Sequence, residues 1–529
     1  MSLLLKIRRY FHTLKHLKPT QVFYRVKYAL IPVYKLKRFS FNGSVNHNLI
    51  LLPHPQEKRI VTINEKFISI ELLNRKKEFH KKIDWTFNGY GRLWNYNLQY
   101  ADFLRQRDLS VSIRESFIRD LFSCLHNGKL QPEPYPASLR VMNTTRFLIH
   151  NFDSIQNTKT IINGLASELQ FISKRLEYHL MGNHLLENGF ALLMGGVYLN
   201  CKKWRLKAEQ LLMQELEEQI LNDGAHFERS VMYHQLMLFR VLEAISYMPK
   251  ESALTDYLLS IASKMISWSK VMAFNDNSAA HFNDSVEEQT YSADYLINLA
   301  LALNSDTNLK LSLSDSGFRV LSSASAELII DTGGIKPKYQ PGHAHADSLS
   351  FIMNLEGSPF IVDPAISTYN IGEQRNWERS TKAHNTVTVD DENSADVWGS
   401  FRVGRRPVVQ ILNESKNKLT AEALYKTNNG LTVRHTRGIS LESNKILIKD
   451  DVICKKRPIG RFYLYPETRI IKITDTSVEF ANGILLLFSK VIKVDTFKYS
   501  YNKGFNRQIE SSGIEYLFTD SCVIEIKIV

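Results

Sequence analysis

The chain of 529 residues contains few cysteines, and they lie far apart. The four cysteines are Cys124, Cys201, Cys454 and Cys522, and no pair has CxxC spacing. A disulfide framework and a thiolate zinc site are both unsupported, because each needs cysteines that are clustered along the chain. We therefore expect four reduced, structural thiols.

Long apolar runs are also missing from the sequence. No uninterrupted stretch of about 18 apolar residues occurs, which argues against a transmembrane helix. The N-terminal segment has only three consecutive leucines before charged residues interrupt it. It therefore lacks the apolar core and the small-residue cleavage site of a secretory signal. The sequence predicts a cytoplasmic protein.

Acidic residues are absent from the first 56 positions. The net charge of the chain is +13, but beyond Arg38 the chain has 57 basic and 54 acidic residues, so the excess belongs mostly to an N-terminal arm. Its mixture of basic, aliphatic and aromatic residues suits contact with the inner face of an anionic membrane, or packing on the rest of the protein. The sequence leaves both interpretations open. No nucleic-acid-binding motif accompanies the arm, so nucleic acid is not expected as a partner.

The composition is that of a folded globular protein, with 44% hydrophobic and 23% charged residues. From about residue 110 to 305, apolar residues recur at spacings of three and four, which predicts short amphipathic helices. After about residue 318, short β-branched and alternating runs predict a large antiparallel sheet structure. We expect a basic N-terminal arm or lead-in at 1–80, a helical domain at 81–315 and an antiparallel β-sandwich at 316–529.

The densest polar cluster is the segment QPGHAHAD, at the start of the predicted β region. If this segment is extended, His343 and His345 point to the same face, because side chains alternate along a strand. Asp363 and His384 follow at predicted strand ends. Two imidazoles and one carboxylate suit zinc or a similar divalent ion, so His345, Asp363 and His384 are the preferred ligands. Ordinary hydrogen bonding of these histidines is the alternative.

In the helical half, the segment GNHLLEN precedes an apolar helix. His184 and Glu187 lie three residues apart, so on a helix they face the same side, where the carboxylate would orient the imidazole and stabilise its charge. The alternative is an ordinary helix start, with Asn183 as the N-cap and Glu187 exposed. The residues alone leave both interpretations open.

The segment DGAHFERSVMYH at 223–234 is turn-like and then helical, and it is rich in ionisable groups. Its Tyr233 is a proton carrier only if cationic or donor groups lower its high pKa or hold its proton in place. His184, His343 or Arg229 would do this if the segments converge in the fold. A core tyrosine with a bonded hydroxyl is the alternative.

Two further segments, 135–143 and 282–285, are candidates for the lining of a cleft. Arginines in or near the first would bind a substrate carboxylate, since the planar guanidinium matches it with two parallel hydrogen bonds. Aromatic residues of the segment GRLWNYNLQY would stack on sugar faces, although core packing explains aromatic residues equally well. The candidate substrate-binding residues are Arg140, Asn143, Arg146, Arg229, Trp94 and Tyr96.

Taken together, these segments resemble the heparinase II/III family of polysaccharide lyases over residues 94–398. The motifs PYPASLR, GNHLLEN, DGAHFERSVMYH, QPGHAHADSLSF and RSTKAHNTV occur in the order that the family shows. The resemblance implies an incomplete helical (α/α) toroid followed by an antiparallel β-sandwich, which agrees with the change of pattern found independently. It also implies that the predicted metal is a structural divalent ion, zinc in the first place.

The resemblance implies roles for individual residues. Asn183 and His184 would lie near the substrate carboxylate, Tyr233 would transfer the proton, and His343 would be its partner at the cleavage point. Glu187 occupies a place where some members of the family keep an active-site carboxylate. Which residue acts as acid and which as base stays open.

The implied reaction is β-elimination on a uronic-acid-containing polysaccharide or oligosaccharide. Loss of the C5 proton builds negative charge on the C6 carboxylate, which nearby donors must neutralise, and an acid must protonate the departing O4. A basic N-terminus resembles that of members linked to capsule or surface-polysaccharide production, which implies work on a nascent glycan at the inner membrane face. The alternatives are a uronyl C5-epimerase, which reprotonates the same carbanion on the opposite face, and a non-catalytic glycan-binding component of an assembly complex.

Overall fold

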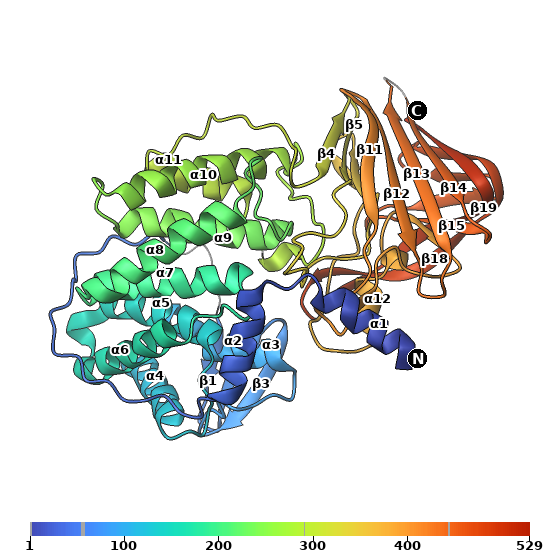
Figure 1. Cartoon of the computed structure of the whole chain (residues 1–529). Helices are drawn as coiled ribbons and strands as arrows, with labels where there is room; N and C mark the ends of the chain where they lie inside the picture. The colour runs from blue at the N-terminus through green and yellow to red at the C-terminus, as the bar shows by residue number, and fades with distance from the viewer. Residues whose placement is uncertain (1–2, 54–58, 290, 443–444, 529) are drawn as a thin grey trace.

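The computed structural model describes residues 3–53, 59–289, 291–442 and 445–528. Helices dominate the N-terminal half and strands the C-terminal half, and the two halves lie side by side (Figure 1). This arrangement confirms the expected fold class, an incomplete helical toroid followed by an antiparallel β-sandwich. Among the described residues, no helix is both long and apolar enough to cross a bilayer.

Amphipathic helices form the toroid, and serine caps fix the starts of several of them. The hydroxyls of Ser110, Ser230 and Ser252 each accept a hydrogen bond from the backbone amide three residues on, which satisfies an amide that a helix start leaves free. The helices of this half are α3 (Arg92–Gln99), α4 (Val111–His126), α5 (Pro134–Asn151), α6 (Thr158–Lys174), α7 (Gly182–Tyr198), α8 (Lys202–Gln219), α9 (Val231–Tyr247), α10 (Ala253–Val271) and α11 (Ala293–Ala302), with the 3-10 turns η1 (Asp102–Arg105), η2 (Phe152–Ser154) and η3 (Glu287–Gln289).

Helix α7 is the most buried helix of the toroid. Apart from His184 and Val197, its residues are buried, which is the pattern of a helix surrounded by others. It contacts α5, α6, α8 and α9. The exception at His184 matters, because it brings one polar side chain of a core helix to the surface of a cavity.

Strands and a few short helices form the C-terminal half. The strands are β4 (Phe318–Ser322), β5 (Ala326–Asp331), β6 (Phe351–Leu355), β7 (Ser358–Ile361), β8 (Val387–Val389), β9 (Val397–Trp398), β10 (Arg402–Val403), β11 (Val408–Ser415), β12 (Lys418–Lys426), β13 (Thr432–Leu441), β14 (Lys445–Ile453), β15 (Pro458–Tyr463), β16 (Ile470–Thr474), β17 (Ser477–Phe480), β18 (Leu485–Gly504) and β19 (Arg507–Lys527). The short helices are α12 (Glu373–Glu378) and η4 (Thr381–Ala383).

The sandwich consists of a small sheet and a large sheet with a shared apolar core. The small sheet has the order β4-β5-β6-β7, and the large one the order β11-β12-β13-β14-β19-β18-β17-β16, with β15 joining β19 to β8. Strand β13 alternates between buried and less buried residues, as expected for a strand with one face on the core. Leu328 and Phe351 of the small sheet pack in one cluster with Ile448 and Ile524 of the large sheet.

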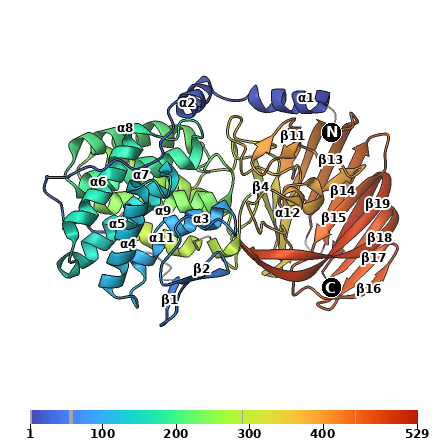
Figure 2. The ribbon, with the colours of Figure 1, turned by 90° about the horizontal axis from the view of Figure 1, so that it is seen from below.

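The long hairpin of β18 and β19 extends from the sandwich to the toroid (Figure 2). Near its tip, Arg507 forms an ion pair with Glu288 of η3. The side chain of Asn74 donates a hydrogen bond of 3.0 Å to the carbonyl of Phe505. Asn74 lies in the turn between two strands of a three-stranded antiparallel sheet, within the region predicted as the N-terminal lead-in. Its strands are β1 (Val61–Ile63), β2 (Phe67–Leu72) and β3 (Arg75–His80).

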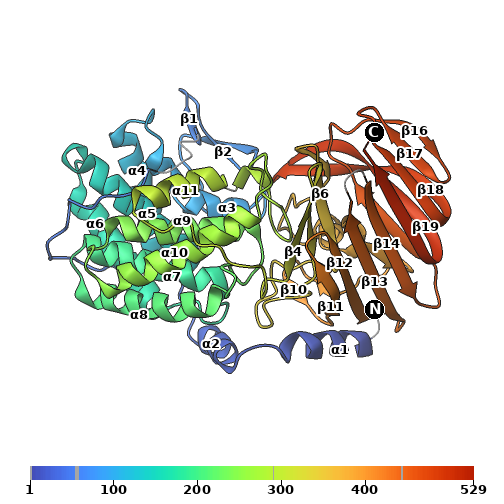
Figure 3. The same ribbon diagram turned by 90° about the horizontal axis from the view of Figure 1, so that it is seen from above.

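The basic N-terminal arm spans both halves of the protein (Figures 2 and 3). Its helix α1 (Leu3–Leu14) lies on the sandwich, where Arg9 forms an ion pair of 2.6 Å with Asp396. Its helix α2 (Pro19–Leu30) lies on the toroid. The structure thus shows an arm packed on the rest of the protein, and membrane contact stays a prediction.

Candidate active site

Asn183, His184, Tyr233 and His343 come together where the toroid meets the sandwich. The first two lie in the first turn of α7, Tyr233 lies in the first turn of α9, and His343 lies in the loop between β5 and β6. The side-chain amide of Asn183 is 3.5 Å from His343 Nε2. The rings of Tyr233 and His343 pack with their centroids 4.0 Å apart. Segments that are far apart in the sequence therefore form one site.

A buried carboxylate, Asp284, holds both histidines of the HAH segment. Its Oδ2 is 2.7 Å from His343 Nδ1, and its Oδ1 is 2.8 Å from His345 Nε2. Arg375 donates to both oxygens, at 2.5 and 2.7 Å. Although burial alone would raise the pKa of Asp284, Arg375 and the two histidines hold it well below its usual value. Asp284 is therefore an anion that accepts hydrogen bonds, which orients both imidazoles.

The loop that carries the two histidines is irregular and not a strand. The two histidines therefore do not share the face of a strand. Both nevertheless point to one residue, Asp284. Since one ring nitrogen of each histidine lies within hydrogen-bond distance of this carboxylate, the second nitrogen of each ring faces elsewhere. His343 Nε2 faces Asn183 and Glu228, at 3.5 and 3.3 Å.

Glu228 fixes the position of Asn183. Its carboxylate accepts hydrogen bonds from the backbone amide of Asn183 at 2.9 Å and from its side-chain amide at 3.0 Å. The preceding Gly182 has a φ of +60°, and a Cβ there would lie 2.3 Å from Glu228 Oε1. Glycine is therefore required at the start of α7, because any side chain would collide with this carboxylate.

The surroundings of Tyr233 favour the protonated form of its hydroxyl. Its hydroxyl is 3.1 Å from the hydroxyl of Tyr369. Burial raises the pKa of Tyr233 well above its usual value, and Tyr369, Asp284 and Glu228 act in the same direction. The expectation that Arg229 stabilises this phenol is wrong, because Arg229 is buried beside Phe318 and forms its ion pair with Asp331.

His184 is paired with a different carboxylate from the expected one. Its Nδ1 is 3.2 Å from Glu177 Oε1, and its ring packs 4.2 Å from that of Tyr135. Burial would lower the pKa of His184, but the Glu177 carboxylate raises it above its usual value overall. Glu187 instead forms an ion pair of 3.0 Å with Arg240. The sequence interpretation of Glu187 as the orienting group is therefore corrected, because Glu177 takes that place.

The predicted metal ligands are buried close together. His384 Nδ1 is 2.7 Å from Asp363 Oδ2, and the rings of His345 and His384 have centroids 5.2 Å apart. Around these ligands, His345 Nδ1, His384 Nε2 and Asp347 Oδ2 are buried and have no hydrogen-bond partner among the described residues. Within the described ranges, no three or more His, Cys, Asp or Glu side chains are arranged as a ready metal site. The metal stays a prediction, and these unpartnered atoms support it.

Three of the candidate substrate-binding residues lie inside the toroid. Arg140 is fully buried and donates to Glu168 Oε1 at 2.7 Å. Asn143 donates to the carbonyl of Tyr100 and to Asp102, each at 2.8 Å. The guanidinium of Arg146 forms an ion pair with Glu243. These side chains have protein partners in place of a substrate, so the structure corrects the predicted carboxylate clamp.

The two aromatic candidates differ in position. Trp94 is buried, and its indole N–H donates to the carbonyl of Arg75 at 3.1 Å, so it packs in the core and offers no sugar platform. Tyr96 is only partly buried and lines a cavity together with His184. Its hydroxyl donates to Glu133 at 2.5 Å. Tyr96 therefore remains a candidate for substrate contact.

Four charged residues of the site were not predicted from the sequence, namely Glu177, Glu228, Asp284 and Arg375. Glu228 and Asp284 lie in the candidate segments 223–234 and 282–285, but no local sequence pattern indicates their partners. Arg375 lies in α12, in a segment without a recognised motif. Its guanidinium meets Asp284 across 91 positions of sequence. A buried arginine and a buried carboxylate are expected to pair, yet only the fold shows which ones do.

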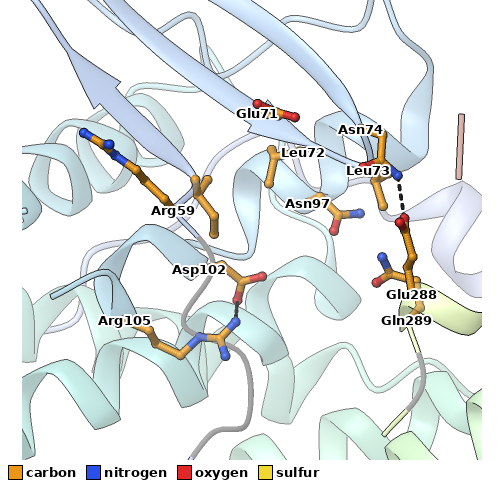
Figure 4. A pocket seen from close by; sticks show the side chains of 11 residues that line it. Arg59, Glu71, Leu72, Leu73, Asn74, Asn97, Asp102, Arg105, Glu288 and Gln289 are labelled. Carbon is orange, nitrogen blue, oxygen red and sulfur yellow. Dashed lines mark hydrogen bonds and ion pairs between the residues drawn. The ribbon is translucent and has the colours of Figure 1, made fainter. Parts of the chain in front are cut away.

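A second cavity lies away from these residues. It has a volume of about 350 Å³ and is lined by Arg59, Asn97, Asp102 and Arg105 together with the end of β2 and η3. Within this cavity Asp102 forms an ion pair with Arg105, and the Asn74 side-chain amide donates a hydrogen bond to Glu288 (Figure 4). The cavity contains none of the histidines or tyrosines of the site.

A helical toroid joined to an antiparallel sandwich, with an Asn, two His and a Tyr at the junction, defines the chain as a toroid-and-sandwich protein. Two family models match the chain: Heparinase II/III N-terminus at residues 138–310, and Heparinase II/III-like, C-terminal at residues 306–490. These matches overlap at residues 306–310 and together span residues 138–490. The chain belongs to the heparinase II/III family.

Curated relatives and solved structures agree with this assignment. Heparin-sulfate lyase of Pedobacter heparinus is 22% identical over 343 residues, covering 58% of this chain and 49% of the relative. Heparin-sulfate lyase of Bacteroides stercoris is 23% identical over 330 residues, covering 55% and 47%. The chain thus spans about half the length of these curated relatives.

Two crystal structures show the same fold. The structure of heparinase III has a TM-score of 0.67 at 16% identity, covering 85% of this chain and 79% of that one. The structure of heparan sulfate lyase HepC from Pedobacter heparinus has a TM-score of 0.56 at 14% identity, covering 96% and 87%. At such low identity, the likeness establishes the fold alone.

Proposed function

We propose that the protein is a polysaccharide lyase that cleaves a uronic-acid-containing glycan by β-elimination. The observation that carries the proposal is the ring contact of Tyr233 with His343, beside the amide of Asn183, at the junction of the two domains. This contact unites a phenol, an oriented imidazole and a hydrogen-bond donor, the group types that a β-elimination needs. The names of the curated relatives, heparin-sulfate lyases, support an acidic polysaccharide as substrate.

The first requirement is to neutralise the uronate carboxylate. Removal of the C5 proton spreads negative charge onto this group, so donors aimed at it lower the barrier. The Asn183 amide and the His184 imidazole are the donors at this place, and Glu177 favours the charged form of His184. Hydrogen bonds to Glu228 keep the Asn183 side chain in position, and those to Glu177 keep the His184 side chain in position.

The second requirement is a base and an acid. Asp284 holds His343 through Nδ1, and Nε2, the nitrogen on the other side of the ring, is the proposed base for the C5 proton. Tyr233 holds its proton at neutral pH and is the proposed acid. The C5–H electrons form the C4–C5 double bond, the C4–O4 bond breaks, and the phenol gives its proton to O4. The products are a 4,5-unsaturated uronate and a new chain end.

A direct test is to incubate the protein with polymers of glucuronate, iduronate, mannuronate and galacturonate and to follow ultraviolet absorbance. The unsaturated uronate absorbs, and the substrates do not. Growth of this absorbance with at least one polymer supports the lyase. Solvent deuterium appearing at C5 without any absorbing product would instead identify a C5-epimerase. Binding without either change would leave a glycan-binding protein.

We also propose that His345, Asp363 and His384 bind a divalent ion, with zinc as the first candidate. The arrangement of His345 supports this proposal, because its Nε2 is 2.8 Å from Asp284 and its buried Nδ1 has no hydrogen-bond partner. Such an ion would fix the loops that carry His343. Elemental analysis of the purified protein and its melting temperature with and without a chelator test this. An ion-free protein whose melting temperature ignores the chelator contradicts it.

The biological setting is a further part of the proposal. A uronate lyase with a basic arm suits the trimming of a nascent capsule or surface polysaccharide at the inner face of a membrane. Sedimentation of the protein with anionic vesicles, compared with neutral vesicles, tests the membrane part. Equal sedimentation with both kinds of vesicle would contradict it.

A further inference from the structure

Helix α2 of the N-terminal arm is fixed on the toroid through one of its faces. This inner face carries Gln21, Tyr24 and Tyr28, at helical spacings of three and four. Gln21 is almost fully buried, and its side-chain amide donates to the carbonyls of Leu180 and Tyr339, at 3.2 and 3.4 Å. These contacts determine which side of α2 points away from the protein.

Helix α1 is fixed on the sandwich in the same way. Arg9 forms its ion pair with Asp396, and the indole N–H of Trp398 donates to the hydroxyl of Thr13 at 3.2 Å. Arg9 and Thr13 are about one helical turn apart and therefore lie on the same side of the helix. The opposite side of α1 faces outward.

Exposed apolar side chains line the outward sides of both arm helices. They recur at helical spacings of three and four, so each helix presents an apolar stripe opposite its inner face. Phe11 is 64% exposed, Phe23 61% and Leu30 76%. A contiguous exposed apolar patch marks an interaction surface in a folded protein. The residues of this arm surface are Ile7, Phe11 and Leu14 of α1 with Val22, Phe23, Val26 and Leu30 of α2.

Basic residues without carboxylate partners flank the arm surface. In the described part of the chain, Arg9 and Lys18 are the residues of the two arm helices and their connection that form ion pairs. The first 56 residues contain no Asp or Glu. Apolar stripes with cations on either side complement a bilayer that has anionic head groups. The flanking residues are Lys6, Arg8, Lys15, Arg25 and Lys27.

The two helices lie at the same edge of the molecule. In Figures 2 and 3 the arm forms the outermost layer on one side, beyond both the toroid and the sandwich. Figure 1 views this layer face-on, and α1 and α2 run within it in different directions. A flat surface can therefore touch both apolar stripes at the same time.

We propose that the arm surface inserts into the head-group region of an anionic lipid bilayer, with both arm helices lying in the membrane plane. This inference rests on the membrane setting proposed above, and it adds the residues that enter the bilayer and the orientation of the protein. Because Gln21 contacts the loops that precede Asn183 and His343, the bound arm would hold the candidate active site next to the bilayer.

The experiment measures vesicle binding of the full chain by cosedimentation. The vesicles contain phosphatidylglycerol mixed with phosphatidylcholine, or phosphatidylcholine alone. The variants are Phe11→Gln, Phe23→Gln and the double variant. Leu301→Gln is the matched control, because it removes a 54% exposed apolar side chain from α11, which lies apart from the arm (Figures 1 and 3).

We expect each phenylalanine variant to weaken binding to the anionic vesicles about tenfold, as for one phenylalanine side chain returned to water, and the double variant to weaken it further. Lys15→Gln and Lys27→Gln should each weaken it about fivefold. Leu301→Gln should bind like the parent. Melting temperatures should stay near that of the parent, because the replaced side chains are exposed.

A second measurement reports insertion directly and tolerates an altered arm. The tryptophan added by Phe23→Trp should lose fluorescence when the vesicles carry brominated lipid, whereas the one added by Leu301→Trp should not. Equal quenching of the two added tryptophans contradicts insertion of the arm surface.

The other outcomes separate this inference from the earlier proposals. Phenylalanine variants that bind anionic vesicles as tightly as the parent overturn the inference but leave a membrane setting based on charge alone. A parent protein that binds no anionic vesicles overturns both. A parent that self-associates without lipid, when the double variant does not, assigns the arm surface to a second copy of the chain and also overturns the inference. If vesicle binding behaves as expected but no uronate polymer gives an unsaturated product, the arm surface stands and the lyase proposal fails.

Discussion

The Asp284 carboxylate offers the sharpest test of how the site works. Asp284→Asn keeps the size of the side chain but removes the charge on which Arg375, His343 and His345 converge. The sandwich contains a matched control. Asp450 is equally buried and accepts from Arg437 and His435 at 2.8 Å each, but it lies far from the candidate catalytic residues in the large sheet.

The loss of stability should be similar in the two variants. Asp284 and Arg375 are both completely buried, so the substitution leaves an uncompensated guanidinium inside the protein. Removing one partner of a buried ion pair costs about 3–5 kcal/mol. The same reasoning and the same magnitude apply to Asp450→Asn, where Arg437 is left alone.

Activity should separate the two variants. In Asp284→Asn the His343 imidazole loses the anion that orients it and stabilises its charge, and loss of such a partner lowers kcat by up to about 10⁴-fold in hydrolase triads. We expect at least about a 100-fold loss of kcat for Asp284→Asn. Asp450→Asn should keep kcat near that of the parent protein, because its neighbours do not touch substrate.

The assays are urea unfolding followed by circular dichroism and initial rates on the best uronate polymer, each measured for the parent and both variants at a temperature where all are folded. An equal kcat for the two variants would refute the orienting role of Asp284. A stable Asp284→Asn protein with an unchanged urea midpoint would refute the argument about the buried ion pair.

Three further predictions concern other residues. Glu177→Gln should lower the pKa of His184, because it removes the carboxylate that raises this pKa. The fall of kcat/KM at alkaline pH, where the His184 cation loses its proton, should therefore move to lower pH. A pH profile without this shift contradicts the cationic role of His184. Tyr233→Phe should reduce kcat by about 10²–10⁴-fold at an unchanged melting temperature, because the ring still packs on His343; near-normal turnover would exclude the phenol as the acid. Arg140→Ala should cost about 3–5 kcal/mol of stability through the buried Glu168 and leave KM unchanged in folded protein, whereas a raised KM would restore Arg140 as a substrate ligand.

The sequence predicted the fold class and the main polar segments because both depend on local signals. Apolar spacing predicts the toroid helices, and alternation predicts strands such as β13. The motifs that contain Asn183, Tyr233 and His343 are likewise contiguous in sequence. The structure then joins these segments, and their mutual distances follow from domain packing alone.

The wrong predictions concern charged residues whose ion-pair partners are distant in the sequence. Arg140 is predicted as a substrate ligand because the sequence does not show its partner. This partner, Glu168, lies on another helix, and the two side chains meet only because α5 packs on α6. His184 was matched with the neighbouring Glu187, yet the turn before α7 brings Glu177 closer. A helical spacing of three predicts a shared face, but it does not predict which carboxylate reaches the imidazole.

The site exists only when both halves of the chain are docked. Asp284 belongs to the helical half, whereas His343, His345 and Arg375 belong to the sandwich, so the hydrogen bonds that orient the base cross the domain junction. The buried ion pair of Arg229 with Asp331 crosses the same junction. Removal of either partner of such a pair leaves a buried charge without compensation, so the junction depends on charged residues from both halves. The arm contacts a loop of each half through Gln21, which places the geometry of Asn183 relative to His343 under the control of three separate segments.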